Sequence, residues 1–314
     1  MFAYFYISFE IVFPILFFMG LGVVIKSANI LTKEDFTKIN TLVFKIFLPV
    51  KLFLEVYKSD FHSAFQLDVV IYAIAGILIL FAVSWFAAVK IAAEPKDLVV
   101  IAQGMSRSNY VLFGMAIASG MYPDRDIGIV SVLAAFIVPL YNILSVFIYE
   151  YYSNNGKFNF KKLFRGIVSN PLIIGSFIGI VFIILNIQVP PLVLRPLSSL
   201  GDIATPLAVI CIGATLSLNA LKKYWKYIGI AVNGKLIFGP LLFGLGAIAA
   251  GIRGVGLAGI FLIFATPTAT ASYPMARELG GNDELAGLIV AVSNIASLFT
   301  LFLWIALLMS WKVI

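Results

Sequence analysis

Residues 266–274 read TPTATASYP and place two prolines and a row of hydroxyl side chains inside an apolar segment. Each proline removes a helical hydrogen bond and clashes with the carbonyl four residues earlier, so a regular helix is interrupted here. At membrane depth a helix breaks only where it is buried in protein or lines a cavity. The stretch therefore predicts a broken membrane helix whose free backbone groups can bind a polar ligand. The alternative is a simple kink, in which the hydroxyl side chains form hydrogen bonds with the freed backbone groups.

The composition around this stretch is that of a protein that crosses the membrane several times. The chain has 314 residues, of which 61% are hydrophobic and 12% are charged, and its mean hydropathy is +1.04. Crossing a hydrocarbon core of about 30 Å takes roughly 20 apolar residues. The apolar windows predict an all-α protein with ten transmembrane helices, at residues 4–26, 36–57, 67–91, 97–119, 126–152, 168–187, 195–219, 228–251, 255–278 and 284–311.

Cysteine and histidine are too scarce for several kinds of site. Cys211 is the only cysteine and His62 the only histidine. This excludes a disulfide framework or a thiolate metal cluster, and it argues against an intramembrane enzyme. No cofactor or metal is expected, although coupling to H⁺ or Na⁺ is left open. Nucleic acid is not an expected partner, because the net charge of +7 comes from basic residues sorted into alternate connections.

The distribution of basic residues also predicts the orientation. Of the 22 lysines and arginines, 13 fall in connections after odd-numbered predicted helices, 5 lie on the opposite side and 4 lie within helices. The positive-inside rule then places both termini outside the cytoplasm of a cell-membrane protein. The longest connection, residues 153–166, is basic and is expected to be a solvated cytoplasmic loop near anionic headgroups.

This connection divides the chain into two halves of five helices, residues 1–152 and 167–314. An odd number of helices per half forces the halves into opposite orientations, as in inverted-repeat transporters. Internal similarity at a nearly constant offset favours this arrangement. Pro14 and Gly22 recur 157 residues later as Pro171 and Gly179, and at an offset of 158 residues 108–116 align with 266–274 and Asp124 aligns with Asn282.

The repeat directs attention to residues 103–109, QGMSRSN, the most polar stretch at the centre of any predicted helix. A cation at the bilayer centre costs about 3 kcal/mol or more, so Arg107 must face a partner or water. Its guanidinium suits a carboxylate ligand. The alternatives are that Arg107 forms a structural ion pair with Asp202 or that its side chain snorkels toward the cytoplasmic face. Asp202 is otherwise a coupling site for a cation or proton. Arg107 and Asn109 lie about 200° apart on a regular helix, so they share a site only if the backbone unwinds between them.

Other charged residues fall within predicted helices. Lys51 and Glu55 are four residues apart and are expected to pair structurally on one helix face. Glu10 is expected to snorkel or to hydrogen-bond rather than to carry a proton. Lys45 and Lys235 either line a cavity with positive potential or extend to an interface.

Short motifs spread over nearly the whole chain form a set: Leu48-Pro49, Ser108-Asn109 with Gly114, Asn170-Pro171, Pro206-Leu207-Ala208 with Gly213-Ala214, and Pro267 with Ala276. In these motifs the chain resembles the auxin efflux carrier family of membrane transporters, which includes bacterial permeases for small organic acids such as malate and malonate. Where relatives carry a glycine and a proline in the fourth helix, this chain has Val111 and Ala116.

The resemblance implies a ten-helix inverted repeat in which helices 4 and 9 are broken and cross near the membrane midplane. Helices 1, 2, 6 and 7 would form a scaffold, and helices 3–5 and 8–10 a transport core. It also implies an elevator mechanism and a homodimer. By this resemblance Asn109 and Pro267 mark the crossing.

The residues and the resemblance together predict a secondary transporter of a small organic anion, a mono- or dicarboxylate such as malate or malonate. A sodium- or proton-coupled carrier of the bile-acid or antiporter kind, and a membrane receptor that binds a ligand without moving it, are the alternatives. The candidate substrate-binding residues are Asn109, Arg107, Ser108, Gly114, Thr266, Pro267 and Thr268, and the candidate coupling-ion or charge-pair residues are Asp202, Glu10, Lys45 and Lys235.

Overall fold

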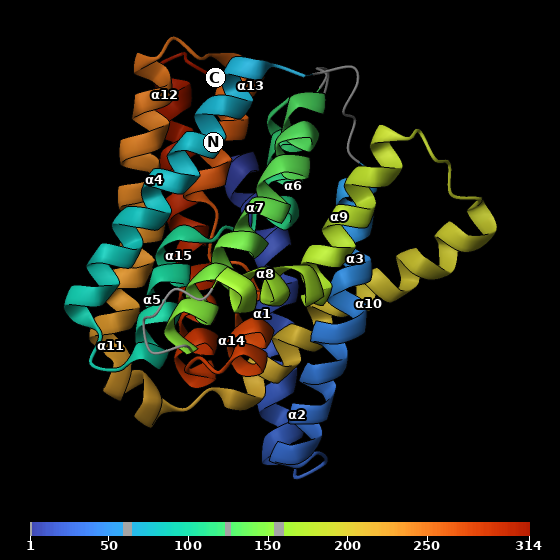
Figure 1. The fold of residues 1–314 in the computed structure, drawn as a ribbon. Coiled ribbons are helices and arrows are strands. Elements are labelled where there is room, and N and C mark those ends of the chain that lie inside the picture. Colours follow the sequence, from blue (N-terminus) through green and yellow to red (C-terminus); the bar gives the residue numbers. More distant parts are fainter. Residues whose placement is uncertain (1, 59–64, 123–126, 154–159) are drawn as a thin grey trace.

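The computed structural model describes residues 2–58, 65–122, 127–153 and 160–314. All regular secondary structure in these ranges is helical, and most of the long helices run up and down the molecule (Figure 1). The elements, with η for π-helical turns, are α1 (Phe2–Ser27), α2 (Lys33–Leu42), η1 (Val43–Phe47), α3 (Leu48–Tyr57), α4 (Leu67–Ile91), α5 (Pro95–Ser106), α6 (Tyr110–Met121), α7 (Gly128–Ser153), α8 (Phe160–Ser169), α9 (Pro171–Ile184), α10 (Pro191–Thr215), α11 (Leu218–Asn233), η2 (Gly234–Phe238), η3 (Pro240–Gly244), α12 (Leu245–Ala249), α13 (Gly254–Ala265), α14 (Ser272–Leu279) and α15 (Asp283–Ser310).

The lengths and composition of these helices are those of a multi-pass membrane protein. Within the described ranges, five helical segments are long and apolar enough to cross a membrane, or six if the bent pair α8 and α9 is one span. The predicted spans at 97–119 and 255–278 are interrupted: α5, α6 and α13 have 12 residues each, about 18 Å of helix. The total of ten spans stays a prediction.

Two expectations about connections are wrong. Residues 153–166 are predicted to be a loop, but helix α8 begins within this stretch at Phe160. Residues 220–227, expected to be a basic connection between two spans, belong to a helical segment that runs on to Ala249. Both stretches contain residues with good helix propensity, such as leucine and lysine. In each stretch the charged residues fall on one face of the helix. A count of charges along the chain does not distinguish such a helix from a loop.

Close contacts between helices depend on glycine at particular positions. A Cβ at Gly22 of α1 would lie 2.1 Å from the carbonyl oxygen of Ile210 in α10, and a Cβ at Gly179 of α9 would lie 2.9 Å from that of Phe53 in α3. Gly20, two residues from Gly22, faces open space. The pairs α1–α10 and α3–α9 therefore pack with their backbones in near contact.

The two predicted interruptions are present. Helix α5 ends at Ser106 and α6 begins at Tyr110, while α13 ends at Ala265 and α14 begins at Ser272. The breaks meet through an antiparallel β-bridge between Ser108 and Thr268. The backbone N–H of Asn109 donates to the carbonyl of Pro267 at 2.8 Å. Their depth in the membrane stays a prediction.

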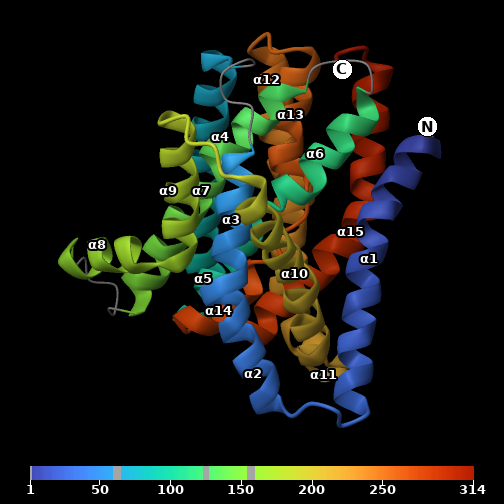
Figure 2. The same cartoon turned by 90° about the vertical axis from the view of Figure 1, so that its right-hand side faces the viewer.

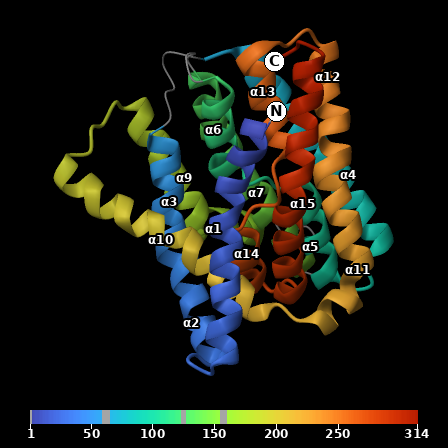
Figure 3. The ribbon, with the colours of Figure 1, turned by 180° about the vertical axis from the view of Figure 1, so that it is seen from behind.

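Both chain termini lie at the same end of the molecule, as the three ribbon views agree (Figures 1, 2 and 3). The turn between α1 and α2 lies at the opposite end of the molecule (Figure 2). From behind, α1 and α15 run side by side (Figure 3), in agreement with their packing. The predicted common side of the termini therefore matches the fold, and which side faces the cytoplasm stays a prediction.

Candidate functional site

The break in the second half frees a backbone carbonyl that a lysine satisfies. Pro267 has no N–H, so the carbonyl of Ile263, four residues earlier, loses its helical donor. The ammonium of Lys235 donates to this carbonyl at 3.0 Å, and the Lys235 side chain is fully buried. Neither Lys235 nor the exposed Lys45 lines the cavity described below. Neither lysine adds its charge to this cavity in this conformation, and Lys235 stabilises the broken helix.

The two breaks satisfy each other through their hydroxyl side chains. In α5, the carbonyl of Gly104 accepts a hydrogen bond from the hydroxyl of Thr268 at 2.8 Å. The hydroxyls of Ser108 and Thr266 share a hydrogen bond of 2.5 Å. Each break therefore supplies partners that the other needs, and neither is held by its own helix alone.

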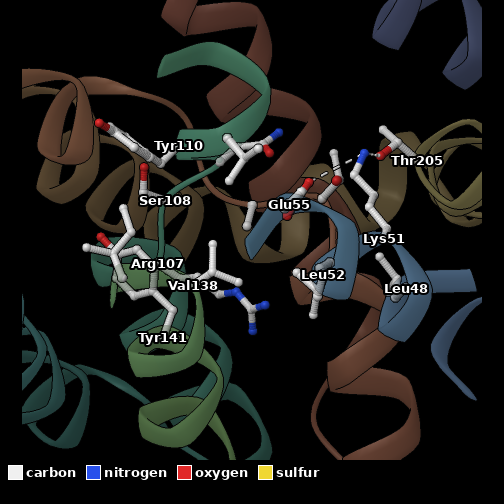
Figure 4. Close-up of a pocket in the computed structure, with 16 residues that line it drawn as sticks. Leu48, Lys51, Leu52, Glu55, Arg107, Ser108, Tyr110, Val138, Tyr141 and Thr205 are labelled. Atoms are coloured by element: carbon white, nitrogen blue, oxygen red, sulfur yellow. Dashed lines mark hydrogen bonds and ion pairs between the residues drawn. The ribbon is translucent and has the colours of Figure 1, made fainter. Parts of the chain in front are cut away.

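A cavity of about 60 Å³ lies beside the crossing (Figure 4). The two breaks, α3, α7 and α10 contribute its walls. This conformation leaves space at the crossing for a small ligand. The polar residues that line it are Lys51, Glu55, Arg107, Ser108, Asn109, Tyr110, Tyr141, Thr205 and Thr270.

The unwound backbone brings Arg107 and Asn109 to the same cavity, whereas a regular helix would hold them about 200° apart. Arg107 is extended (φ −79°, ψ 133°), and Asn109 has φ −87° and ψ 47°, outside the helical region. The side-chain amide nitrogen of Asn109 is buried without a hydrogen-bond partner in the described structure. Leaving such a donor unpaired costs about 1–3 kcal/mol. A ligand with an acceptor atom would remove this cost.

The Arg107 guanidinium is held by neutral acceptors. It donates to the side-chain oxygen of Asn142 at 2.8 Å, to the hydroxyl of Ser145 at 3.1 Å and to the sulfur of Met275 at 2.9 Å. Among the described residues it forms no ion pair with Asp202, which is exposed and lines a neighbouring cavity. The structural pair weighed for Arg107 and Asp202 is therefore absent here, and the charge of Arg107 acts on the cavity from its wall.

Lys51 and Glu55 form the predicted pair, with 3.9 Å between ammonium and carboxylate. The Lys51 ammonium also donates to the hydroxyl of Thr205 at 2.6 Å (Figure 4). Both side chains line the cavity at the crossing and a second cavity of about 280 Å³, which Asp202 also lines. Sequence reasoning missed them as site residues because a pair four apart suggests local stabilisation. The sequence signal that could have identified Lys51 and Glu55 as site residues is the presence of two charges within an apolar segment.

The predicted substrate-binding residues fall into two groups. Arg107, Ser108 and Asn109 line the cavity. Gly114 lies instead under the ring of Tyr110, which a Cβ would approach to 2.9 Å. The second break reaches the cavity three residues later than predicted. Thr266, Pro267 and Thr268 hold the crossing, and the cavity is lined by Ala269, Thr270 and Ala271. The side chain of Glu10 and all of His62 lie outside the described part of the structure.

Interrupted apolar helices that meet at a small polar cavity define the architecture of a membrane transport protein. The chain matches the family described as "Membrane transport protein" over residues 7–161 and again over residues 157–305. It belongs to this family, the auxin efflux carrier family whose motifs it carries. It is also 28% identical over 137 residues to a "Putative malonate transporter" of Rhizobium meliloti (strain 1021). That match covers 43% of this chain and 43% of the relative, less than half its length.

The division between holding and lining residues predicts different effects for two threonines in the second break. Thr268→Val removes the hydrogen bond to Gly104 and should lower stability by about 1 kcal/mol, a decrease in Tm of about 1–2 °C for a chain of this size. Thr270→Val, the same substitution two residues along, should lower Tm by less than half as much. Thermal unfolding of the purified protein in detergent measures both. Equal decreases would contradict the division.

Proposed function

We propose that this protein is a secondary transporter of a small organic anion, a mono- or dicarboxylate such as malate or malonate. The observation that carries the proposal is the unpaired, buried amide of Asn109 at the junction of the broken helices. Directly after it, α6 begins at Tyr110, and α14 begins beside Ala271, both of which line the cavity. Free N–H groups and the positive dipole end of a helix N-terminus favour an anion.

The charges around the cavity also support an anionic substrate. Of the charged side chains that line it, Lys51 and Arg107 are basic and Glu55 is acidic, an excess of one positive charge. The relative described as a malonate transporter supports the carboxylate class. Coupling to H⁺ or Na⁺ is a separate proposal, for which Glu55 in this cavity and Asp202 in the adjoining one are the placed carboxylates.

We propose further that the fold is a ten-helix inverted repeat. The two close glycine contacts support this, because they are related by one offset: Gly22 and Gly179 are 157 residues apart, and so are their partners Phe53 and Ile210. Ser108 and Thr266, which bond to each other, are 158 apart. The family matches the chain twice, once in each half. The halves are residues 1–152 and 167–314.

Alternating access requires contacts that break between scaffold and core, and two candidates join α2 to α14. Arg277 donates to the hydroxyl of Thr37, and the hydroxyl of Thr41 donates to the carboxylate of Glu278 at 2.6 Å. These two contacts do not line the second cavity. That cavity and the cavity at the crossing have Lys51 as a common lining residue. In the proposed elevator cycle this conformation is closed at the α2–α14 contact.

The location and assembly of the transporter are part of the same proposal. The sorting of basic residues supports a cell-membrane protein with both termini outside the cytoplasm. Membership of the auxin efflux carrier family supports a homodimer.

Asn109 gives the most direct test of function. Asn109→Asp replaces the unpaired donor with a carboxylate of the same shape and should reduce the initial rate of radiolabelled malonate counterflow in proteoliposomes at least about tenfold, because it repels an anion. Asn219→Asp, at an exposed position of α11, is the control for added charge. Full activity of the Asn109 variant would refute the site. Saturable binding by the wild type with no flux under any gradient would favour a receptor.

The single cysteine reports on the proposed elevator movement. Cys211 is fully buried, with its sulfur 3.8 Å from the carbonyl of Phe36, next to the α2–α14 contact. The double variant Thr37→Val/Thr41→Val loses both hydrogen bonds and should raise the rate of maleimide labelling of Cys211 by about tenfold. Cys211→Ser supplies the background. An unchanged rate in a variant that still transports would exclude opening at this contact.

A further inference from the structure

Helix α8 is short and basic, and the chain bends sharply between it and α9. Its ten residues, FKKLFRGIVS, include three basic and no acidic residues. It ends before Asn170, which is extended (φ −75°, ψ 122°) and caps α9 by accepting a hydrogen bond from the N–H of Leu172 at 2.9 Å. Because Pro171 restricts the residue before it, the chain turns by 64° between α8 and α9. Helix α8 consequently projects sideways from the body (Figure 2).

The two faces of α8 carry different side chains. At 100° per residue, Leu163, Phe164, Ile167 and Val168 fall on one arc of the helix, and the basic positions fall on the arc that adjoins it. Phe164 is 69% exposed and Val168 54% exposed. An amphipathic helix with an exposed apolar arc beside basic residues is typical of helices that lie in the membrane interface.

The packing of α8 leaves these exposed side chains uncovered. The helix contacts α7 at Gly166, where a Cβ would lie 2.9 Å from the Glu150 side chain. Lys161 and Arg165 are exposed. The apolar arc and the cations therefore both remain available beside the bundle.

We propose that α8 lies in the membrane interface and binds the headgroups of anionic phospholipids. Phe164 and Val168 enter the acyl boundary, while Lys161 and Arg165 meet the headgroup phosphates. A bilayer fits better than a soluble partner, because α8 is joined through one residue to the apolar helix α9 and so lies beside the lipid. The predicted topology makes this the cytoplasmic leaflet. The proposal stands independently of the transported substrate.

Fluorescence quenching by brominated lipids tests the lipid class. Phe164→Trp adds an indole at an exposed position, and the wild type supplies the background of the four native tryptophans. The protein is reconstituted into bilayers of phosphatidylcholine and phosphatidylglycerol at a fixed ratio, with bromine on the acyl chains of one lipid or the other. Quenching of the added indole should be about twofold stronger when phosphatidylglycerol carries the bromine.

Charge variants in the Phe164→Trp background locate the effect. Lys161→Gln/Arg165→Gln should remove the preference, whereas Lys33→Gln/Lys38→Gln, which removes two exposed charges from α2, should leave it. Equal quenching by the two lipids would overturn the headgroup preference. Absence of quenching would show that α8 lies outside the bilayer, as for a soluble partner. Equal loss of preference in both charge variants would overturn the assignment to α8.

Discussion

The structure depends on one constraint: backbone groups freed inside a helix that crosses a membrane must find partners within the protein. Here the two interrupted helices supply those partners for each other, through the Ser108–Thr268 bridge and the bond from Thr268 to Gly104. The ammonium of Lys235 satisfies the carbonyl that Pro267 leaves free. Either break alone would leave buried groups unpaired, so the two breaks are stable only when they meet.

The cavity is a consequence of this meeting. Two helices restart at one place and bring their N-terminal ends to the same small volume, which an anion satisfies better than a neutral molecule. The side chains at the crossing differ in their hydrogen bonding according to their position. The hydroxyls of Thr266 and Thr268 form hydrogen bonds within the crossing, whereas the side-chain nitrogen of Asn109 has no hydrogen-bond partner in the described structure. The Lys51–Glu55 pair separates the cavity from the wider one beside it.

Much of the fold follows from local sequence signals. Apolar windows predict α4 at residues 67–91, its observed bounds, and Pro267 and Pro274 predict the break in the second half. The break at residues 107–109 is a different case, because Val111 and Ala116 replace the expected glycine and proline. It forms through tertiary hydrogen bonds to the other break, which no local pattern encodes.

The site is harder to predict from the sequence than the fold, because its residues come from helices far apart in the chain. Lys51 has two uses at once, in an ion pair and in a cavity wall, and spacing reveals only the first. Lys235 reaches a carbonyl 28 residues away, so its position within a helix could not show its partner. The basic residues of α8 show a third limit, since a charge count treats an amphipathic helix and a loop alike.

A structure of the protein in lipid nanodiscs, determined with and without saturating malonate, tests the central claim most directly. The account predicts ligand density at the crossing, with a carboxylate oxygen about 3 Å from the Asn109 amide nitrogen and beside the first turn of α6. Density only in the wider cavity near Asp202, or an unoccupied crossing under conditions that support flux, would contradict it.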